Sequence, residues 1–144
     1  MIACTFFGHR HIYREIENSL RETIINLIEK KSVELFYVGN QGEFDFLVKK
    51  VLIELKKRYS HINFFVVLAY FPTKKDYTYK EYFTDTIYPV NLESVPRKFA
   101  ISQRNRWMIN KSQFVVTYVE HIIGGAAQFK ELAEKKRKTV INIL

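Results

Sequence analysis

Five stretches of the chain are almost continuously apolar and rich in β-branched and aromatic residues. This pattern is typical of strands that are buried on both faces. It predicts strands at residues 2–7, 33–38, 62–70, 114–119 and 139–144, with a short sixth strand around 86–89.

The segments between these strands have apolar residues at spacings of three and four. Ile16, Leu20, Ile24, Leu27 and Ile28 repeat in this way and predict an amphipathic helix over 13–31. By the same reasoning we expect helices at 44–59, 97–111 and 126–138, and a short helical turn at 79–83.

Apolar strands that alternate with helices predict an α/β fold with a mainly parallel, doubly wound, Rossmann-like sheet and helices on both faces. Ligands of such sheets bind outside the carboxyl ends of the strands. Three glycine-containing loops are expected at those ends, at residues 8–10, 39–45 and 121–126. The chain has no GxGxxG and no GxxxxGK[ST] motif, which argues against a standard dinucleotide fold and a P-loop NTPase.

A length of 144 residues suits one domain over 1–144. The single cysteine, Cys4, excludes an internal disulfide framework, and the four histidines lack zinc-ligand spacing, so we expect no metal and no cofactor. The apolar runs are shorter than a bilayer requires and no signal peptide is recognisable, so we predict a cytoplasmic protein without a membrane partner.

The formal net charge is +8, and most of the excess lies in the second half of the chain. Five basic residues and no acidic one occur between positions 97 and 111, namely Arg97, Lys98, Arg104, Arg106 and Lys111. This basic segment is a candidate for binding phosphates or nucleic acid. The run Lys135–Lys138 instead suits the negative end of a helix dipole.

Several motifs together resemble the SLOG superfamily, the Rossmann-like group that includes DprA and the Lonely Guy phosphoribohydrolases. They are FFGHR, YVGNQGEFD, VVLAYFP, FAISQRNRWMINKSQFVVTYVEH, GGAAQF and KTVINIL. The resemblance covers essentially the whole chain and is greatest to a subgroup of short bacterial proteins of unknown function. It implies a nucleotide or nucleotide-derived ligand at the strand ends. It also implies a role as sensor, hydrolase or single-stranded DNA-binding protein, and makes a homodimer plausible.

The Lonely Guy motif PGGxGTxxE is only partly matched. Gly124 and Gly125 agree with it and Glu131 falls at its glutamate, whereas Ala127 and Gln128 replace its third glycine and threonine. Glu131 also suits a solvated helix face. We therefore assign no phosphoribohydrolase activity, and His121 and Glu131 remain weak catalytic candidates.

Each candidate ligand contact has an ordinary structural alternative. A glycine turn before a helix exposes amides to an anion, but it is also a common tight turn. Arg10 suits a phosphate or an ion pair with Glu15, and Asp45 suits a ribose hydroxyl or the helix dipole. Asn40 and Gln41 suit a base or sugar, or a turn. The predicted contacts are Gly8, His9, Arg10, Gly39, Asn40, Gln41, Gly42, Asp45, Arg104, Asn105, His121, Gly124, Gly125 and Ala126.

The sequence thus predicts a domain that binds a phosphorylated, nucleotide-derived small molecule, as sensor or enzyme. The alternatives are a DprA-like nucleic-acid-binding protein that uses the basic segment, and a nucleotide N-glycosidase.

Overall fold

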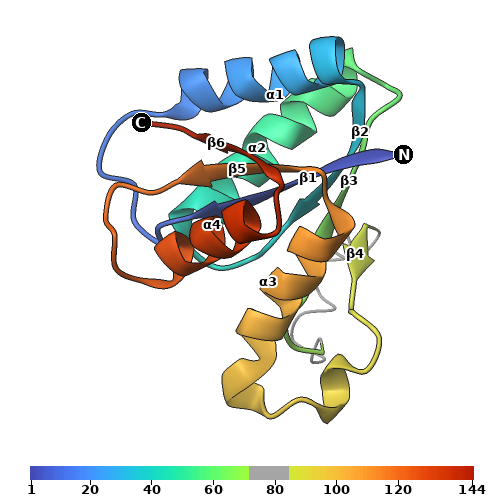
Figure 1. Ribbon diagram of the computed structural model, residues 1–144. Coiled ribbons are helices and arrows are strands. Elements are labelled where there is room, and N and C mark those ends of the chain that lie inside the picture. Colours follow the sequence, from blue (N-terminus) through green and yellow to red (C-terminus); the bar gives the residue numbers. More distant parts are fainter. Residues whose placement is uncertain (72–84) are drawn as a thin grey trace.

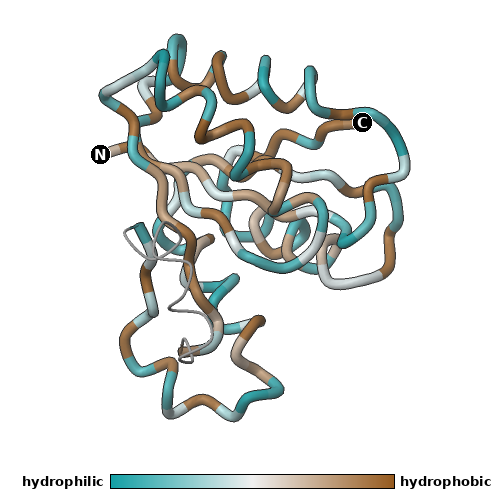
Figure 2. The backbone as a smooth tube through the Cα atoms, turned by 180° about the vertical axis from the view of Figure 1, so that it is seen from behind, coloured by the Kyte–Doolittle hydropathy of each residue, from teal (hydrophilic) through white to brown (hydrophobic). Residues whose placement is uncertain are grey.

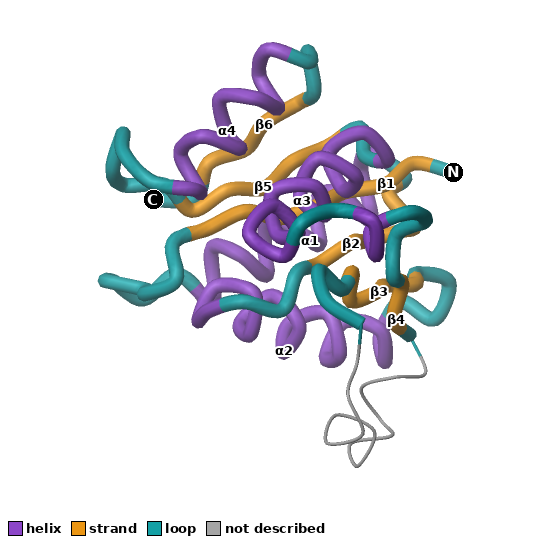
Figure 3. Tube along the Cα trace, turned by 90° about the horizontal axis from the view of Figure 1, so that it is seen from below, coloured by secondary structure: helices purple, strands orange, loops and turns teal. Residues whose placement is uncertain are grey.

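A computed structural model describes residues 1–71 and 85–144. Its centre is a six-stranded sheet in which all pairs are parallel, in the order β4-β3-β2-β1-β5-β6. Figure 3 shows the strands side by side in this order. Their bounds are β1 Ile2–Gly8, β2 Val33–Val38, β3 Asn63–Val67, β4 Thr86–Ile87, β5 Phe114–Tyr118 and β6 Thr139–Asn142.

Helices cover both faces of the sheet (Figure 1). The described helices are α1 Glu17–Lys31, α2 Gly42–Arg58, α3 Ala100–Lys111 and α4 Gly125–Lys135, with 3-10 turns at Leu92–Ser94 and Arg97–Phe99. α1 and α2 lie on one face, and α3 and α4 lie on the other. The predicted Rossmann-like α/β fold is confirmed, whereas the helical turn predicted at 79–83 lies outside the described residues. In the described ranges, no helix is long and apolar enough to cross a membrane.

Alternation along β1 divides the core into two apolar clusters. Cys4 and Phe6 face the helices α1 and α2, whereas Ala3 and Phe7 belong to the cluster that α3 and α4 cover. Figure 2 shows the strands as largely hydrophobic and α1 as alternating between hydrophobic and hydrophilic positions. Both faces of the sheet are therefore buried under helices, as the continuous apolar strands predict.

The first helix begins later than its apolar spacing predicts. α1 starts at Glu17 rather than at residue 13. The preceding loop is bound by distant groups, because the amide of Tyr13 donates to the hydroxyl of Tyr118 at 3.0 Å and the amide of Ile12 donates to Glu43 at 2.8 Å. These tertiary hydrogen bonds hold the loop after β1 in a non-helical conformation, near the carboxyl edge of the sheet.

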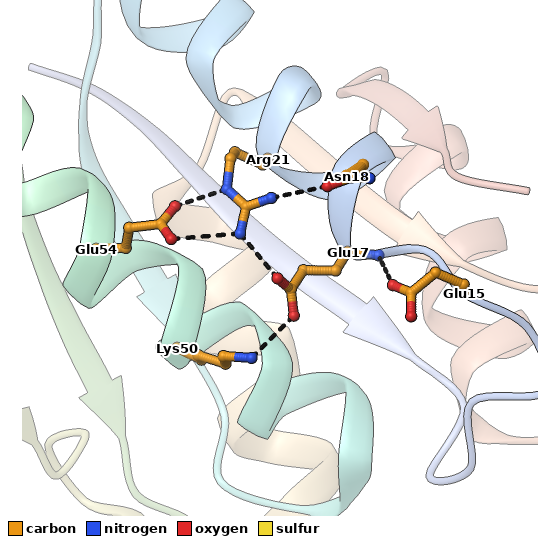
Figure 4. Close-up of polar contacts among 6 residues, drawn as sticks. All are labelled: Glu15, Glu17, Asn18, Arg21, Lys50 and Glu54. Atoms are coloured by element: carbon orange, nitrogen blue, oxygen red, sulfur yellow. Dashed lines mark hydrogen bonds and ion pairs between the residues drawn. The ribbon is translucent and has the colours of Figure 1, made fainter.

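Polar side chains join α1 to α2 on the outside of their layer (Figure 4). The Nε of Arg21 donates to Glu54 at 2.6 Å and its Nη2 donates to Glu17 at 2.9 Å, while Lys50 donates to Glu17 at 3.0 Å. This network stabilises the layer opposite α3 and α4, away from the candidate site.

Candidate functional site

The strand order reverses between β1 and β5, because β2, β3 and β4 extend the sheet on one side of β1 and β5 and β6 extend it on the other. In doubly wound sheets, this switch point is where ligands bind. A cleft of about 280 Å³ opens there. It is lined by Phe6, Phe7, Gly8, His9, Arg10, Gln41, Asp45, Ile101, Arg104, Asn105, Met108, Gly125, Ala126 and Phe129.

Gly8 ends β1 where the strand packs closely on α2. A Cβ at this position would lie 2.3 Å from the ring of Phe44. Glycine is therefore required at this position by close packing against Phe44.

Arg104 forms the floor of the cleft and is only 2% exposed. Its Nε donates to Asn105 at 2.7 Å, and its Nη1 donates to Asn40 at 3.2 Å and to the carbonyl of Val67 at 2.9 Å. Its Nη2 donates to Gln41 at 2.6 Å. The guanidinium thus ties the β2–α2 loop, the end of β3 and α3 together.

All four acceptors of Arg104 are neutral. Among the described residues, no carboxylate forms an ion pair with it, and one of its five N–H groups has no acceptor. Burial lowers the pKa of Arg104, against the opposing effect of the nearby Asp45. A guanidinium still remains charged at neutral pH, so the cleft floor carries a buried positive charge that is near Asp45 but forms no ion pair with any described residue.

Asp45 lies in the first turn of α2 and contributes a partly buried carboxyl to the cleft. One of its oxygens accepts the backbone N–H of Gln41 at 3.0 Å. A Cβ on Gly39 would approach this same oxygen to 2.7 Å and the guanidinium carbon of Arg104 to 3.3 Å, so glycine leaves room for both groups. Burial raises the pKa of Asp45 to about 6, and the hydrogen bond from Gln41 and the charge of Arg104 only partly offset this effect.

His9 contacts the β5–α4 loop. Its Nε2 accepts backbone N–H groups from Glu120 at 2.8 Å and from His121 at 3.3 Å, and its ring lies 4.7 Å from that of His121. Burial lowers the pKa of His9, and the neighbouring His121 lowers it further. The structure therefore favours a neutral imidazole at His9 over an imidazolium, because a protonated Nε2 could not accept these hydrogen bonds.

Arg10 lies at the mouth of the cleft and is exposed. Within residues 1–71 and 85–144 its guanidinium has no ion pair, and the expected alternative, a pair with Glu15, is not formed. Gly42 packs against Arg10 at positive φ (+88°), and a Cβ there would lie 2.8 Å from the Cα of Arg10. The backbone of Arg10 is thus fixed while its charged group remains available.

The N-terminus of α4 lies at the same cleft. Gly124, the N-cap, has a φ of +114° and makes no side-chain capping hydrogen bond. A Cβ at Gly124 or Gly125 would meet no heavy atom within 4 Å. The described structure therefore leaves open space beside these two glycines, at the positive end of the helix dipole, where first-turn amides have no intrahelical acceptor.

Some predicted contacts do not line the cleft. Asn40 accepts a hydrogen bond from Arg104, and Gly39 leaves room for Arg104 and Asp45. Gly42 packs against the backbone of Arg10, and Gly124 is the N-cap of α4. His121 is exposed and packs on the rings of His9 and Tyr13. Glu131 forms an exposed ion pair with Lys135, at 3.2 Å, which is the solvated alternative considered for it.

The sequence also predicts Arg104 as one of five residues of a basic segment that could bind phosphates or nucleic acid. Because Arg104 is buried, its guanidinium is unavailable to a polyanion at the surface, and the predicted segment loses this residue. Trp107 on the same helix is partly buried and packs on Tyr37 at 5.2 Å between ring centroids, against the core cluster that α3 and α4 cover.

Sequence reasoning missed the apolar lining, which comprises Phe6, Phe7, Ile101, Met108 and Phe129. Helical spacing contains a usable signal, since Ile101, Asn105 and Met108 follow one another at intervals of four and three on α3. Phe7 and Phe129 stack at 5.5 Å and give the cleft an aromatic wall.

Comparison with solved structures identifies the same fold in two bacterial proteins. DNA processing protein A from Helicobacter pylori superposes with a TM-score of 0.67 over 98% of this chain and 64% of its own, at 15% identity. The protein of the same name (DprA) from Streptococcus pneumoniae gives 0.70 over 98% and 50%, also at 15% identity. No family model and no curated protein matches the chain. The chain therefore has the Rossmann-like fold of these two structures, as the resemblance predicted, and it spans less than two thirds of either neighbour.

Proposed function

We propose that this fold, shared with DprA, binds a phosphorylated, nucleotide-derived small molecule in the cleft between β1 and β5. The observation that carries the proposal is that the cleft is bordered both by the buried guanidinium of Arg104, which forms no ion pair with a carboxylate of the described residues, and by the N-terminus of α4. A buried guanidinium that is hydrogen-bonded to neutral groups, with Asp45 nearby but not paired to it, favours an anionic ligand, because the ligand replaces the stabilisation that water no longer gives.

The two ends of the cleft suit different parts of such a ligand. The exposed guanidinium of Arg10 and the amides of Gly125 and Ala126 supply donors for phosphate oxygens. The stacked rings of Phe7 and Phe129, with Met108, supply an apolar wall for a base. We place the phosphate at α4 and the remainder of the ligand toward the β2–α2 loop.

Catalysis is not part of the proposal. Asp45 is the carboxyl that lines the described cleft, whereas Glu131 lies on the outer side of α4 and His121 is outside the lining. The role as a sensor, or as an enzyme for a reaction to be identified, rests on what the ligand proves to be.

The second candidate is single-stranded nucleic acid. The H. pylori neighbour is described by its single-stranded DNA binding mode. Here, Arg97 lies 4.1 Å above the ring of Tyr70, and Lys98 lies 5.1 Å from the ring of the half-exposed Phe99. Cations interleaved with aromatic rings suit stacked bases and their phosphates.

A ligand screen separates these candidates. The purified protein is analysed by mass spectrometry for co-purifying molecules and by thermal shift against nucleotides, cyclic nucleotides, NAD, ADP-ribose and single-stranded oligonucleotides. At about 100 times its dissociation constant, a ligand adds roughly 2.7 kcal/mol and raises the melting temperature by several degrees.

Salt dependence then distinguishes the two ligand classes. A single-stranded oligonucleotide that contacts several phosphates loses affinity steeply between 50 and 200 mM salt, by roughly three-hundredfold for six contacts. A small ligand in the cleft loses far less. Stabilisation by oligonucleotides alone, with a steep salt slope, replaces the leading proposal with the second. The predicted homodimer is tested by light scattering on the same samples.

A further inference from the structure

The cleft has one acidic side chain among its described lining, and its surroundings are unusual for a carboxyl. Asp45 lies near two cations. The guanidinium of Arg104 and the carboxyl of Asp45 lie on either side of the space where a Cβ of Gly39 would be, and Lys49 lies on the next turn of α2. His9 and Arg10 line the same cleft. Despite these neighbours, the described residues contain no ion pair of Asp45 with any of them.

The hydrogen bonds of Asp45 leave an acceptor unused. One carboxyl oxygen accepts the amide of Gln41 at 3.0 Å, and the described part of the chain supplies no donor to the other oxygen. The amide of the N-cap residue Gln41 holds the carboxyl in place, and the missing Cβ of Gly39 leaves room for it. A positioned carboxylate with a free oxygen accepts hydrogen bonds only, so it attracts O–H and N–H groups and repels phosphate.

We propose that Asp45 is a specificity-determining residue that requires a hydrogen-bond donor on the ligand, a sugar hydroxyl or a base amino group, and that it fixes the ligand's orientation in the cleft. This inference rests on the proposed function, because it presupposes an anion at the α4 end. The two ends of the cleft then have opposite hydrogen-bonding character. Donors at Arg10 and Gly125 face the phosphate of the ligand, and an acceptor at Asp45 faces a donor group of the ligand.

The expected selectivity comes from the free-energy cost of burying the Asp45 carboxylate without a hydrogen-bond donor. A ligand without the donor leaves the carboxylate desolvated and unpaired, and a ligand with a second phosphate at this position brings two negative charges together. Loss of a hydrogen bond to a charged group in such a site reduces affinity by roughly tenfold or more. The same selectivity is expected to weaken in acid, because burial raises the pKa of Asp45 to about 6 and the protonated carboxyl is a weaker acceptor.

Matched nucleotides test the inference. Isothermal titration at pH 7.5 and pH 5.5 compares each ribonucleoside 5′-monophosphate with its 2′-deoxy and 3′-deoxy forms, which lack a sugar hydroxyl. It also compares adenosine 5′-monophosphate with purine riboside 5′-monophosphate, which lacks the amino group of the base. The ratio of affinities within a pair cancels the titration of the phosphate, which both members share.

The variants are Asp45→Asn and, as control, Glu22→Gln, which removes an exposed carboxylate on α1 outside the cleft. We expect one pair to differ by about tenfold or more at pH 7.5, and by less at pH 5.5, in the natural protein and in Glu22→Gln. In Asp45→Asn the preference should shrink severalfold at pH 7.5 and lose its pH dependence.

Each other outcome overturns a definite claim. Equal affinity within every pair, or a preference that Asp45→Asn retains, overturns the role of Asp45 and leaves the proposed function standing. Absence of binding to all members overturns both for this ligand class. If Asp45→Asn does not fold, the pairwise ratios of the natural protein at the two pH values still decide the matter.

Discussion

Replacement of Arg104 by methionine tests whether the buried guanidinium organises the cleft. Methionine matches the unbranched stem of arginine but supplies no donor. The carbonyl of Val67 and the side-chain oxygen of Asn105 are buried and would lose their donors, whereas Asn40 and Gln41 lie where water can replace the guanidinium.

The magnitude follows from these two buried acceptors. Each unsatisfied buried acceptor costs about 1–3 kcal/mol, and relief from burying the charge of Arg104 offsets part of this cost. We therefore expect Arg104→Met to lower the free energy of unfolding by about 2–4 kcal/mol, which lowers the melting temperature by roughly 5–15 °C in a domain of this size. Arg104→Lys should have a smaller effect, because it keeps a donor but loses the planar fork.

The assay is urea denaturation followed by circular dichroism, with the slope of the transition as a check that the unfolded state is unchanged. Arg106→Met is the matched control, because Arg106 is exposed on the same helix, and it should lie within about 0.5 kcal/mol of the natural protein. If Arg104→Met were as stable as Arg106→Met, the hydrogen bonds of Arg104 would not be structural and the reasoning would be refuted.

Three further substitutions probe other parts of the structure. Gly8→Ala places a methyl group 2.3 Å from the Phe44 ring and should lower the free energy of unfolding by about 1–3 kcal/mol in urea denaturation; an unchanged midpoint would contradict the close packing. The pKa of Asp45 is raised from 3.8 to about 6, so its contribution to stability is full below pH 4 and declines as pH rises through 6. Asp45→Asn should therefore raise the free energy of unfolding at pH 7 by about 1–3 kcal/mol, and the free energy of unfolding of the variant should depend less on pH between pH 4 and 7. If the variant were less stable than the natural protein at pH 7, the charged form of Asp45 would be the favoured one. Arg21→Ala removes the ion pairs to Glu17 and Glu54 and should cost about 1 kcal/mol in low salt and less in 1 M salt; a cost independent of salt would assign the effect to packing of the arginine stem.

The sequence predicts the fold well because strand burial and helix period are local signals. The strand at 33–38 is found with its observed bounds, and the parallel order follows from the alternation of elements. The start of α1 is displaced because Tyr13 is hydrogen-bonded to Tyr118, a residue 105 positions away, which no window of local sequence contains.

The candidate site is predictable in position but less so in the roles of its residues. The three glycine loops do meet at the switch point, and the spacing of Arg104 and Met108 places both on the inner face of α3. That Arg104 serves Asn40, Gln41 and Val67 depends on three elements brought together by the fold. The same holds for His9, whose acceptor nitrogen is occupied by the β5–α4 loop.

The central claim is that an anion binds at the N-terminus of α4, and a charge substitution at Gly125 tests it most directly. A side chain at this position meets open space, and an aspartate in the first turn favours the helix dipole, so Gly125→Asp should fold at least as well as the natural protein. Gly125→Asn has nearly the same size without the charge. In isothermal titration with the nucleotide that stabilises the protein most in the ligand screen, we predict that Gly125→Asp loses affinity by at least about tenfold relative to Gly125→Asn, because a carboxylate repels the phosphate at close range. Equal affinity of the two variants would contradict the account.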